Sequence, residues 1–88
     1  MKNKRREALI LTMEECGELI QACSKVIRTM KDDEVDDVWL KKLQDEVGDV
    51  SCMVDILFMT GLVSRDQIDG RKKDKKRKLC KWSTIFEK

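Results

Sequence analysis

Two long stretches of the chain repeat their apolar residues at alternating spacings of four and three, and this pattern constrains the fold most strongly. Because an α-helix has 3.6 residues per turn, such spacing places the apolar side chains on one helix face. The chain contains no proline and only four glycines. No stretch alternates apolar and polar residues as a strand would. The sequence therefore predicts an all-α protein.

The spacing predicts one long helix from about Lys4 to Met30 and a second from about Asp37 to Thr60. The apolar row of the first comprises Leu9, Met13, Cys16, Ile20, Cys23, Ile27 and Met30. The row of the second, which has one charged member, comprises Trp39, Leu43, Glu46, Val50, Met53 and Leu57. The acidic stretch "KDDEVDD" between them breaks the pattern, and we expect its last aspartates to cap the second helix.

A third helix is predicted from about Arg65 to Lys81. Gly61 suits the end of the preceding helix, and Ser64 suits the start of the next. Gly70 is a weak point within this third helix. The last residues, "WSTIFEK", have no helical pattern, and we expect them either to pack on another subunit or to fray.

At 88 residues the chain makes one domain, residues 1–88, whose core must be thin because only four residues are aromatic. Domains of this size often need a metal or a partner subunit to complete them. We therefore expect an antiparallel helical bundle, built from two long helices and a basic third helix, whose core a second subunit completes.

The hydrophobic segments are too short for a signal peptide or a membrane span. Glu14 and Glu15 interrupt the apolar run near the start. The most apolar window, residues 50–63, contains Asp55 and falls short of the ~18 residues that a membrane span requires. We expect a cytoplasmic protein that does not contact a membrane.

Four cysteines occur without CxxC spacing, and the chain has no histidine, so the sequence does not predict a zinc site. We expect Cys16, Cys23 and Cys52 to be small buried hydrophobic residues in a reducing cytoplasm.

Each long helix carries a pair of carboxylates three residues apart, Glu15 with Glu18 and Glu46 with Asp49. Residues at this spacing are neighbours on one helix face. Antiparallel packing of the two helices would bring the pairs opposite each other. Four oxygen ligands would then converge.

Glu46 is the most informative of these acids because it lies within the apolar row of its helix. Burying an ionised carboxylate costs several kcal/mol unless a counter-charge meets it, and no Lys or Arg lies in register on either row. A divalent cation would resolve the conflict. Ligation by carboxylates alone favours Mg²⁺, with Mn²⁺ as a possible substitute. The alternative, ordinary surface ion pairs with Lys25, Lys42 or the basic tail, suits Glu14 and Asp45 but not Glu46.

The acids form the pattern Glu14-Glu15-x-x-Glu18, followed after 27 residues by Glu46-x-x-Asp49. This pattern, within the text "EECGELIQA" and "LQDEVGDV", resembles the EExxE and ExxD motifs of MazG-like nucleoside triphosphate pyrophosphohydrolases, in the all-α NTP pyrophosphatase superfamily. The resemblance covers about residues 6–82.

The resemblance implies hydrolysis of a nucleoside triphosphate to a monophosphate and pyrophosphate. It implies Mg²⁺ bound by Glu15, Glu18, Glu46 and Asp49, and a homodimer or homotetramer with a four-helix core formed across subunits. It also implies a role in clearing damaged or surplus nucleotides. Without histidine, the general base is either a carboxylate, Glu14 or Glu15, or the metal-bound hydroxide itself.

The segment from Arg71 to Lys81 holds eight basic residues and one acid, whereas the rest of the chain holds eleven basic and sixteen acidic residues. We expect the basic segment to bind substrate phosphates. Similar proteins carry a Lys and, four residues later, an Asn. Lys72 matches the Lys, but Lys76 replaces the Asn and Arg77 follows, which puts base or sugar recognition in doubt. Lys25 is a further candidate for phosphate binding.

We do not expect nucleic acid as a partner, because the basic segment lacks interleaved aromatic residues and Gly-rich turns. Trp39 is expected in the core, and the role of Trp82 stays open. The alternative to the enzyme is a small helical binding module whose basic helix contacts nucleic acid or an acidic partner. A third possibility is a purely structural helical dimer.

Overall fold

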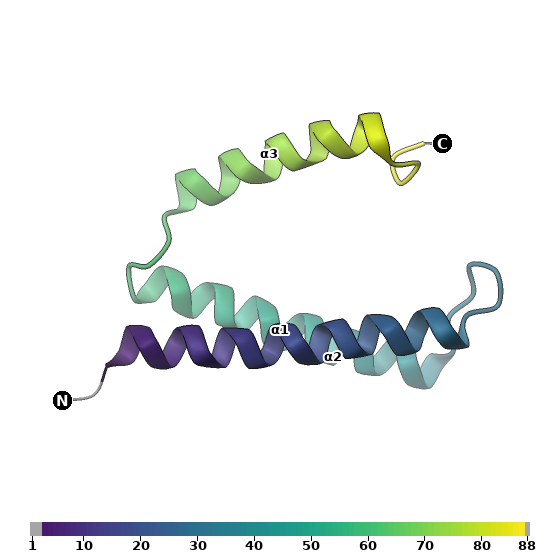
Figure 1. Ribbon diagram of the computed structural model, residues 1–88, viewed down its shortest axis with the longest axis horizontal. Coiled ribbons are helices and arrows are strands. Elements are labelled where there is room, and N and C mark those ends of the chain that lie inside the picture. Colours follow the sequence, from purple (N-terminus) through teal and green to yellow (C-terminus); the bar gives the residue numbers. More distant parts are fainter. Residues whose placement is uncertain (1–2, 88) are drawn as a thin grey trace.

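The computed structural model describes residues 3–87 and shows three helices, with no strand in this part of the chain. The helices are α1 (Lys4–Thr29), α2 (Asp37–Met59) and α3 (Arg65–Trp82). Figure 1 shows α1 and α2 lying antiparallel, side by side, as a hairpin, with α3 standing apart from it. The predicted all-α fold is confirmed, and each helix end lies within one residue of its predicted position.

Side-chain caps start all three helices where the sequence places capping residues. The side chains of Asn3, Asp36 and Ser64 accept hydrogen bonds from backbone N–H groups in the first turns of α1, α2 and α3. These bonds satisfy donors that the helix itself leaves unpaired. After α2, Gly61 adopts a φ of 75°, a left-handed conformation that favours glycine.

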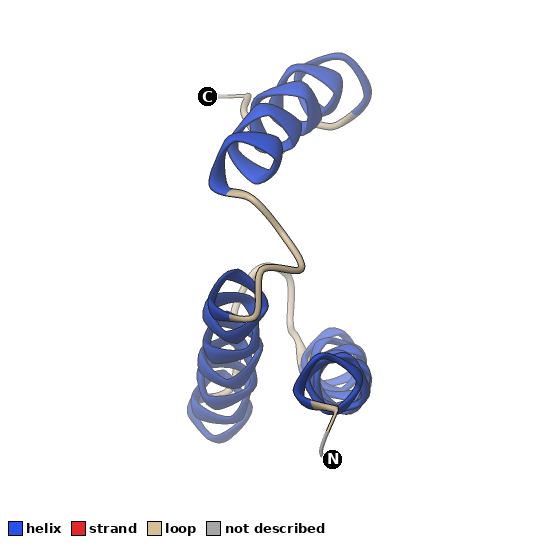
Figure 2. Ribbon diagram, turned by 90° about the vertical axis from the view of Figure 1, so that its left-hand side faces the viewer, coloured by secondary structure: helices blue, strands red, loops and turns tan. Residues whose placement is uncertain are grey.

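The hairpin is the packed part of the molecule. Of the described residues, four hydrophobic ones are buried, and three of them lie on α1. They are Ala8, Ala22, Val26 and Met53. The two alanines leave little side chain between the helix backbones, and Met53 of α2 supplies bulk. The core is therefore a narrow seam between α1 and α2, whose ribbons Figure 2 shows next to each other, with α3 apart from both.

The predicted row of α2 faces α1, but the predicted row of α1 does not face α2. Met53 is buried and the other members of the α2 row are half-buried. On α1, by contrast, Met13, Ile20 and Ile27 are 70% or more exposed. The α1 row that packs against α2 lies one position earlier along the chain, and comprises Ala8, Thr12, Glu15, Leu19, Ala22 and Val26.

The row that the spacing identified on α1 is not the one that packs on α2, because this helix carries two adjacent rows, rotated by about 100° from each other. Periodicity detects both rows but cannot tell which one meets a neighbouring helix. We call the unpacked one the exposed row; it comprises Leu9, Met13, Cys16, Ile20, Cys23 and Ile27. The prediction that Cys16, Cys23 and Cys52 are buried is wrong for the single chain, in which all three are exposed.

The single chain is more open than a typical folded protein of its size. Its radius of gyration is 15.9 Å, against about 12 Å expected for a compact chain of this length. Its accessible surface is 7751 Å², against about 5,400 Å² expected for a folded protein of 10.3 kDa. Much of the excess comes from α3, which buries none of its residues.

α3 meets the hairpin near its own first turn. There the guanidinium of Arg65 lies 4.5 Å above the ring centre of Phe58. Beyond that point α3 diverges from α1 and α2 (Figure 1). No helix in residues 3–87 combines the length and the apolar character needed to cross a membrane.

Replacing Gly61 by Ala should destabilise the protein by about 1 kcal/mol, because the left-handed conformation strains a residue with a Cβ atom. That Cβ would also lie 3.2 Å from Nη2 of Arg5. Gly48→Ala is the matched control: it lies inside α2, where an added Cβ meets nothing within 4 Å, and should stabilise by about 0.5 to 1 kcal/mol. Urea unfolding measures the change in the free energy of unfolding for both variants. Equal changes would contradict the left-handed conformation of Gly61.

Candidate metal centre

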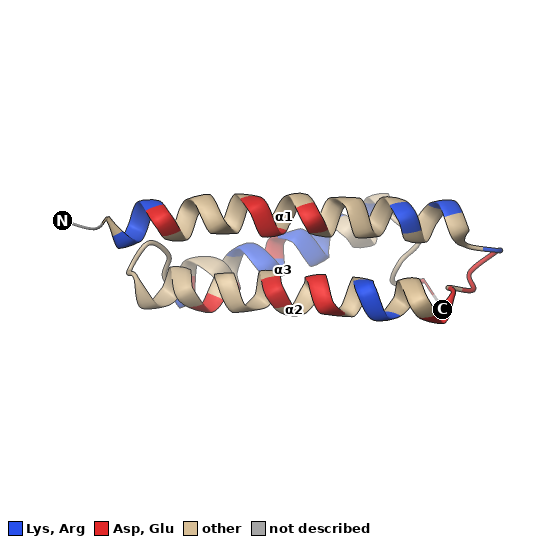
Figure 3. Cartoon of the chain, turned by 90° about the horizontal axis from the view of Figure 1, so that it is seen from below, with Lys and Arg blue, Asp and Glu red and all other residues tan. Residues whose placement is uncertain are grey.

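The two carboxylate pairs converge between α1 and α2, as the sequence predicted. One oxygen from each of Glu15, Glu18, Glu46 and Asp49 can be chosen so that all four atoms lie within 4.8 Å of one another. Figure 3 shows the acidic bands of α1 and α2 side by side near the middle of the hairpin. We call this group the acidic centre.

The helix rows explain how the acidic centre is held. Glu15 belongs to the α1 row that packs against α2, and Glu46 belongs to the α2 row that packs against α1. Both are half-buried, whereas Glu18 and Asp49 are exposed. The centre therefore has a buried side inside the helix seam and an open side that a ligand can approach.

Two oxygens on the buried side of the centre have no hydrogen-bond partner within the described chain. Oε2 of Glu15 and Oε2 of Glu46 are both buried and have no hydrogen-bond partner among residues 3–87. The ion pairs found in this part of the chain involve other acids, Lys41 with Asp45 and Arg77 with Asp74, each at 3.2 Å. Four carboxyl groups thus lie together without an ion pair to a Lys or Arg of this part of the chain.

This arrangement raises the pKa of both half-buried acids above the ordinary value. For Glu15, burial is the main cause and the negative charges of Glu18 and Asp49 add to it. For Glu46, burial again comes first and Glu18 follows. Both effects disfavour the ionised form.

A divalent cation fits these observations because it would supply the missing positive charge and coordinate the two orphaned oxygens. Four carboxylates without nitrogen or sulfur ligands suit a hard ion such as Mg²⁺ or Mn²⁺. Structural ion pairs do not account for these four acids, because none of them pairs with a Lys or Arg in this region of the chain. The four acids of the centre therefore fit the divalent cation that the sequence suggested.

A groove of about 260 Å³ adjoins the acidic centre and shares two of its acids. We call it the lysine groove; its lining residues are Glu18, Gln21, Ala22, Lys25, Trp39, Lys42 and Glu46. Carboxylates form one part of its wall, and two ammonium groups and an indole form another. The Nζ atom of Lys25 lies 5.0 Å from the ring centre of Trp39, a cation–π contact that holds the two side chains together.

Of the residues predicted to bind substrate, Lys25 lies beside the acidic centre and the others lie on α3. Lys25 lines the groove, as does Lys42, which the sequence suggested only as a surface partner for the acids. The spacing that could have identified Lys42 is its position one turn before Glu46. Trp39 is half-buried, so it is partly the core residue that was expected, but it also forms a wall of the groove.

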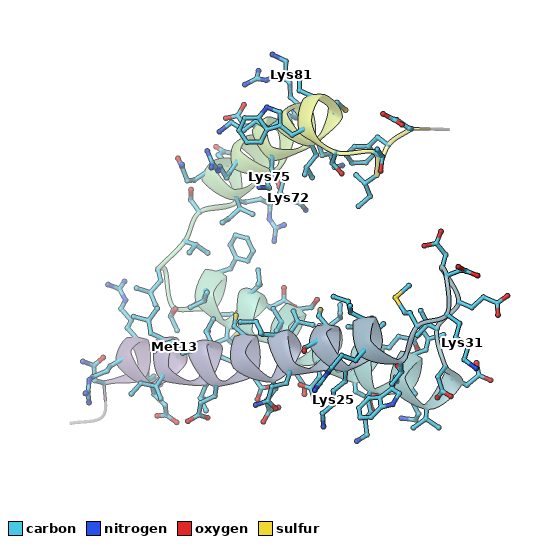
Figure 4. All side chains as sticks on the ribbon, turned by 45° about the vertical axis from the view of Figure 1, so that its right-hand side comes forward. Met13, Lys25, Lys31, Lys72, Lys75 and Lys81 are labelled. Carbon is cyan, nitrogen blue, oxygen red and sulfur yellow. The ribbon has the colours of Figure 1, made fainter. Side chains whose placement is uncertain are left out.

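The basic residues of α3 are not part of this site in the single chain. Lys72, Lys76 and Arg77 are exposed on α3, and Arg77 pairs locally with Asp74. Figure 4 shows Lys25 on the side of the hairpin facing away from Lys72 and Lys75. Glu14 is exposed and is not one of the four clustered acids, unlike its neighbour Glu15.

Mg²⁺ should stabilise the protein, and more strongly at pH 7 than at pH 5. Glu15 and Glu46 have raised pKa values when folded, so between pH 4.5 and those values the folded state holds more protons than the unfolded one. Metal-free stability therefore falls as the pH rises through that window. The cation binds the ionised acids, and at a hundred times its Kd it adds about 2.7 kcal/mol.

Thermal melting with MgCl₂ or with NaCl of equal ionic strength, at both pH values, tests this effect. A melting temperature at pH 7 that is the same in both salts would contradict the presence of a metal centre.

No protein-family model, curated protein or solved structure matches the chain. The resemblance to MazG-like enzymes therefore stays a prediction from the sequence. The acidic centre and the lysine groove are the observations from which a function has to be inferred.

Proposed function

We propose that the protein is a Mg²⁺-dependent nucleoside triphosphate pyrophosphohydrolase, which cleaves between the α and β phosphates to give a monophosphate and pyrophosphate. The observation that carries this proposal is the convergence of four carboxylates with two orphaned buried oxygens. The MazG-like sequence pattern selects this reaction among those that an acidic metal centre can support. The cytoplasmic location and the role in clearing nucleotides expected from the sequence belong to the same proposal.

In this proposal Glu15, Glu18, Glu46 and Asp49 hold Mg²⁺, with Mn²⁺ as a substitute. When bound, the cation offsets the charge that develops on the phosphates and makes a water more acidic. The open side of the centre, at Glu18 and Asp49, leaves room for phosphate oxygens. The half-buried acids anchor the centre between the two helices.

The lysine groove is the proposed binding place for the rest of the nucleotide. A triphosphate carries more negative charge than one divalent cation neutralises, and Lys25 and Lys42 supply further positive charge next to the centre. The indole of Trp39 offers a flat apolar surface suited to a base. Gln21 adds an amide that can both donate and accept hydrogen bonds.

Either of two carboxylates, Glu14 or Glu15, is proposed as the group that accepts the proton of the attacking water. Glu15 is part of the centre that would hold the cation and its water. Glu14 is exposed beside it and is not occupied in the four-carboxylate cluster. The proposal assigns the base to one of these two.

The proposal includes a homodimer in which two hairpins form a four-helix core. The hairpin leaves large apolar side chains in water, since Met13, Ile20 and Ile27 of α1 are each 70% or more exposed, and burial of apolar surface is typical of obligate interfaces. The exposed row of α1 borders an apolar groove of about 480 Å³. Leu40 and Val47 add exposed apolar surface on α2. A second copy covering these residues would bury Cys16 and Cys23.

Ile20→Lys should abolish the dimer, because it puts a charge into the centre of an apolar interface. The matched control is Asp55→Lys, which introduces the same side chain at an exposed position on α2. Light scattering coupled to size exclusion measures the mass. A wild-type chain that is monomeric at high micromolar concentration, or a dimer that Ile20→Lys does not weaken, would contradict this part of the proposal.

Glu46→Gln should lower turnover at least about 100-fold, because it removes a charged ligand oxygen from the centre. It should also raise the stability of the metal-free protein, because it removes a half-buried charge that lacks a partner. Asp45→Asn is the matched control: this neighbouring acid is exposed, pairs with Lys41 and lies outside the centre. Its turnover should equal that of the wild type.

The measurement is anion-exchange analysis of a panel of nucleoside triphosphates incubated with Mg²⁺ or with EDTA. Monophosphate and pyrophosphate should appear only with Mg²⁺. Diphosphate and phosphate as products would show a different reaction. Unchanged activity of Glu46→Gln would remove the acidic centre from the mechanism.

A further inference from the structure

The basic segment of α3 is the largest concentration of charge that the proposed enzyme site does not use. All eight of its Lys and Arg side chains are exposed. Within residues 3–87, Arg77 is the one member of this group that forms an ion pair, with Asp74. Figure 3 shows the basic colour along α3, and Figure 4 shows Lys72, Lys75 and Lys81 projecting from it.

The positive charges surround the helix instead of lining one face. At 100° per residue, the eight side chains leave a narrow strip near Ile68 and Leu79 as the apolar part of the surface. A helix that binds a lipid surface needs a broad apolar face, which α3 lacks. Charge on every side suits a flexible polyanion that can follow the helix around its circumference.

α3 also needs a counter-charge for its own stability. Like charges stand four residues apart along it, as in Arg71 with Lys75 and Lys72 with Lys76, and such pairs destabilise a helix. The helix gains little from packing, because none of its residues is buried. An anionic partner along α3 would turn this repulsion into attraction.

Aromatic side chains stand at the end of the basic segment. Trp82, the last residue of α3, is 82% exposed, and Phe86, four residues later, is 51% exposed. Bases stack on such exposed rings, and stacking beside a positively charged surface is the usual means of binding single strands. The sequence pattern argued against nucleic acid for lack of interleaved aromatic residues; at the end of α3 two aromatic rings lie exposed next to the charges.

We infer that α3 and the segment after it, residues 65–87, form a binding surface for single-stranded nucleic acid. The cations contact phosphates, and Trp82 and Phe86 stack on bases. The rest of the chain, outside residues 65–87, carries a net negative charge, with thirteen acids against ten basic residues, and repels the strand. Binding is therefore confined to α3, which stands apart from the hairpin (Figure 1). This surface is independent of the acidic centre.

The test uses the full chain and a fluorescent 12-nucleotide oligothymidylate, in EDTA so that the acidic centre takes no part. Fluorescence anisotropy gives the affinity between 50 and 200 mM salt. If four phosphates are neutralised, affinity should fall roughly 50-fold over this range, a log–log slope of about −2.8.

Two variants separate charge from stacking. The triple variant Lys73→Gln, Lys75→Gln, Lys78→Gln should make the slope shallower by about 2, because three phosphate contacts are lost. Trp82→Ala should weaken binding about tenfold without changing the slope. The control variant Arg28→Gln, Lys31→Gln, Lys41→Gln removes the same charge outside α3 and should bind like the wild type. Circular dichroism confirms that each variant keeps its helices.

Three results would overturn the inference. The first is absence of binding at 50 mM salt. The second is equal affinity for a labelled polyglutamate peptide of similar charge, which would identify an acidic protein as the partner. The third is equal affinity for duplex DNA together with no effect of Trp82→Ala, which would show that charge alone attracts the strand.

Discussion

The hairpin brings four carboxylates together that form no ion pair with a Lys or Arg of residues 3–87, and much of the molecule is organised around this conflict. Glu15 and Glu46 take positions in the seam where apolar side chains would pack better. Burial and, after it, neighbouring negative charge resist their ionisation, so the metal-free protein holds a local source of instability. Such a cost is typical of a site that has to bind an ion.

The thin seam between α1 and α2 explains why a second subunit enters the proposal. Alanines on the packed row of α1 let the two helices approach, but they bury little area. The larger apolar side chains of α1 lie on the exposed row, 100° away. Two hairpins packed through these rows would bury the apolar side chains that the single chain exposes to water. The acidic centre would stay within each hairpin.

Charge is divided between the two parts of the molecule. The hairpin and its loop carry most of the acidic residues and α3 is basic (Figure 3), yet α3 stands apart from the hairpin (Figure 1). Positive charge for a nucleotide at the acidic centre comes from Lys25 and Lys42 within the hairpin. The charge of α3 is thereby left for a partner outside the chain. Because the hairpin is negatively charged and α3 is positively charged, a long polyanion would bind to α3 alone.

The sequence by itself determined the three helices, their ends and the convergence of Glu15, Glu18, Glu46 and Asp49. These features are local or follow from one antiparallel pairing: capping residues, 3.6-residue periodicity and carboxylates three apart leave few alternatives. Tertiary structure alone decided which of the two α1 rows packs against α2, because both have helical spacing and only the partner surface distinguishes them. It also placed Lys42 and Trp39 beside the centre and kept Lys72, Lys76 and Arg77 away from it. The positions of these side chains depend on how helices that are far apart in the sequence pack against each other. A repeating pattern within one helix carries no information about that packing.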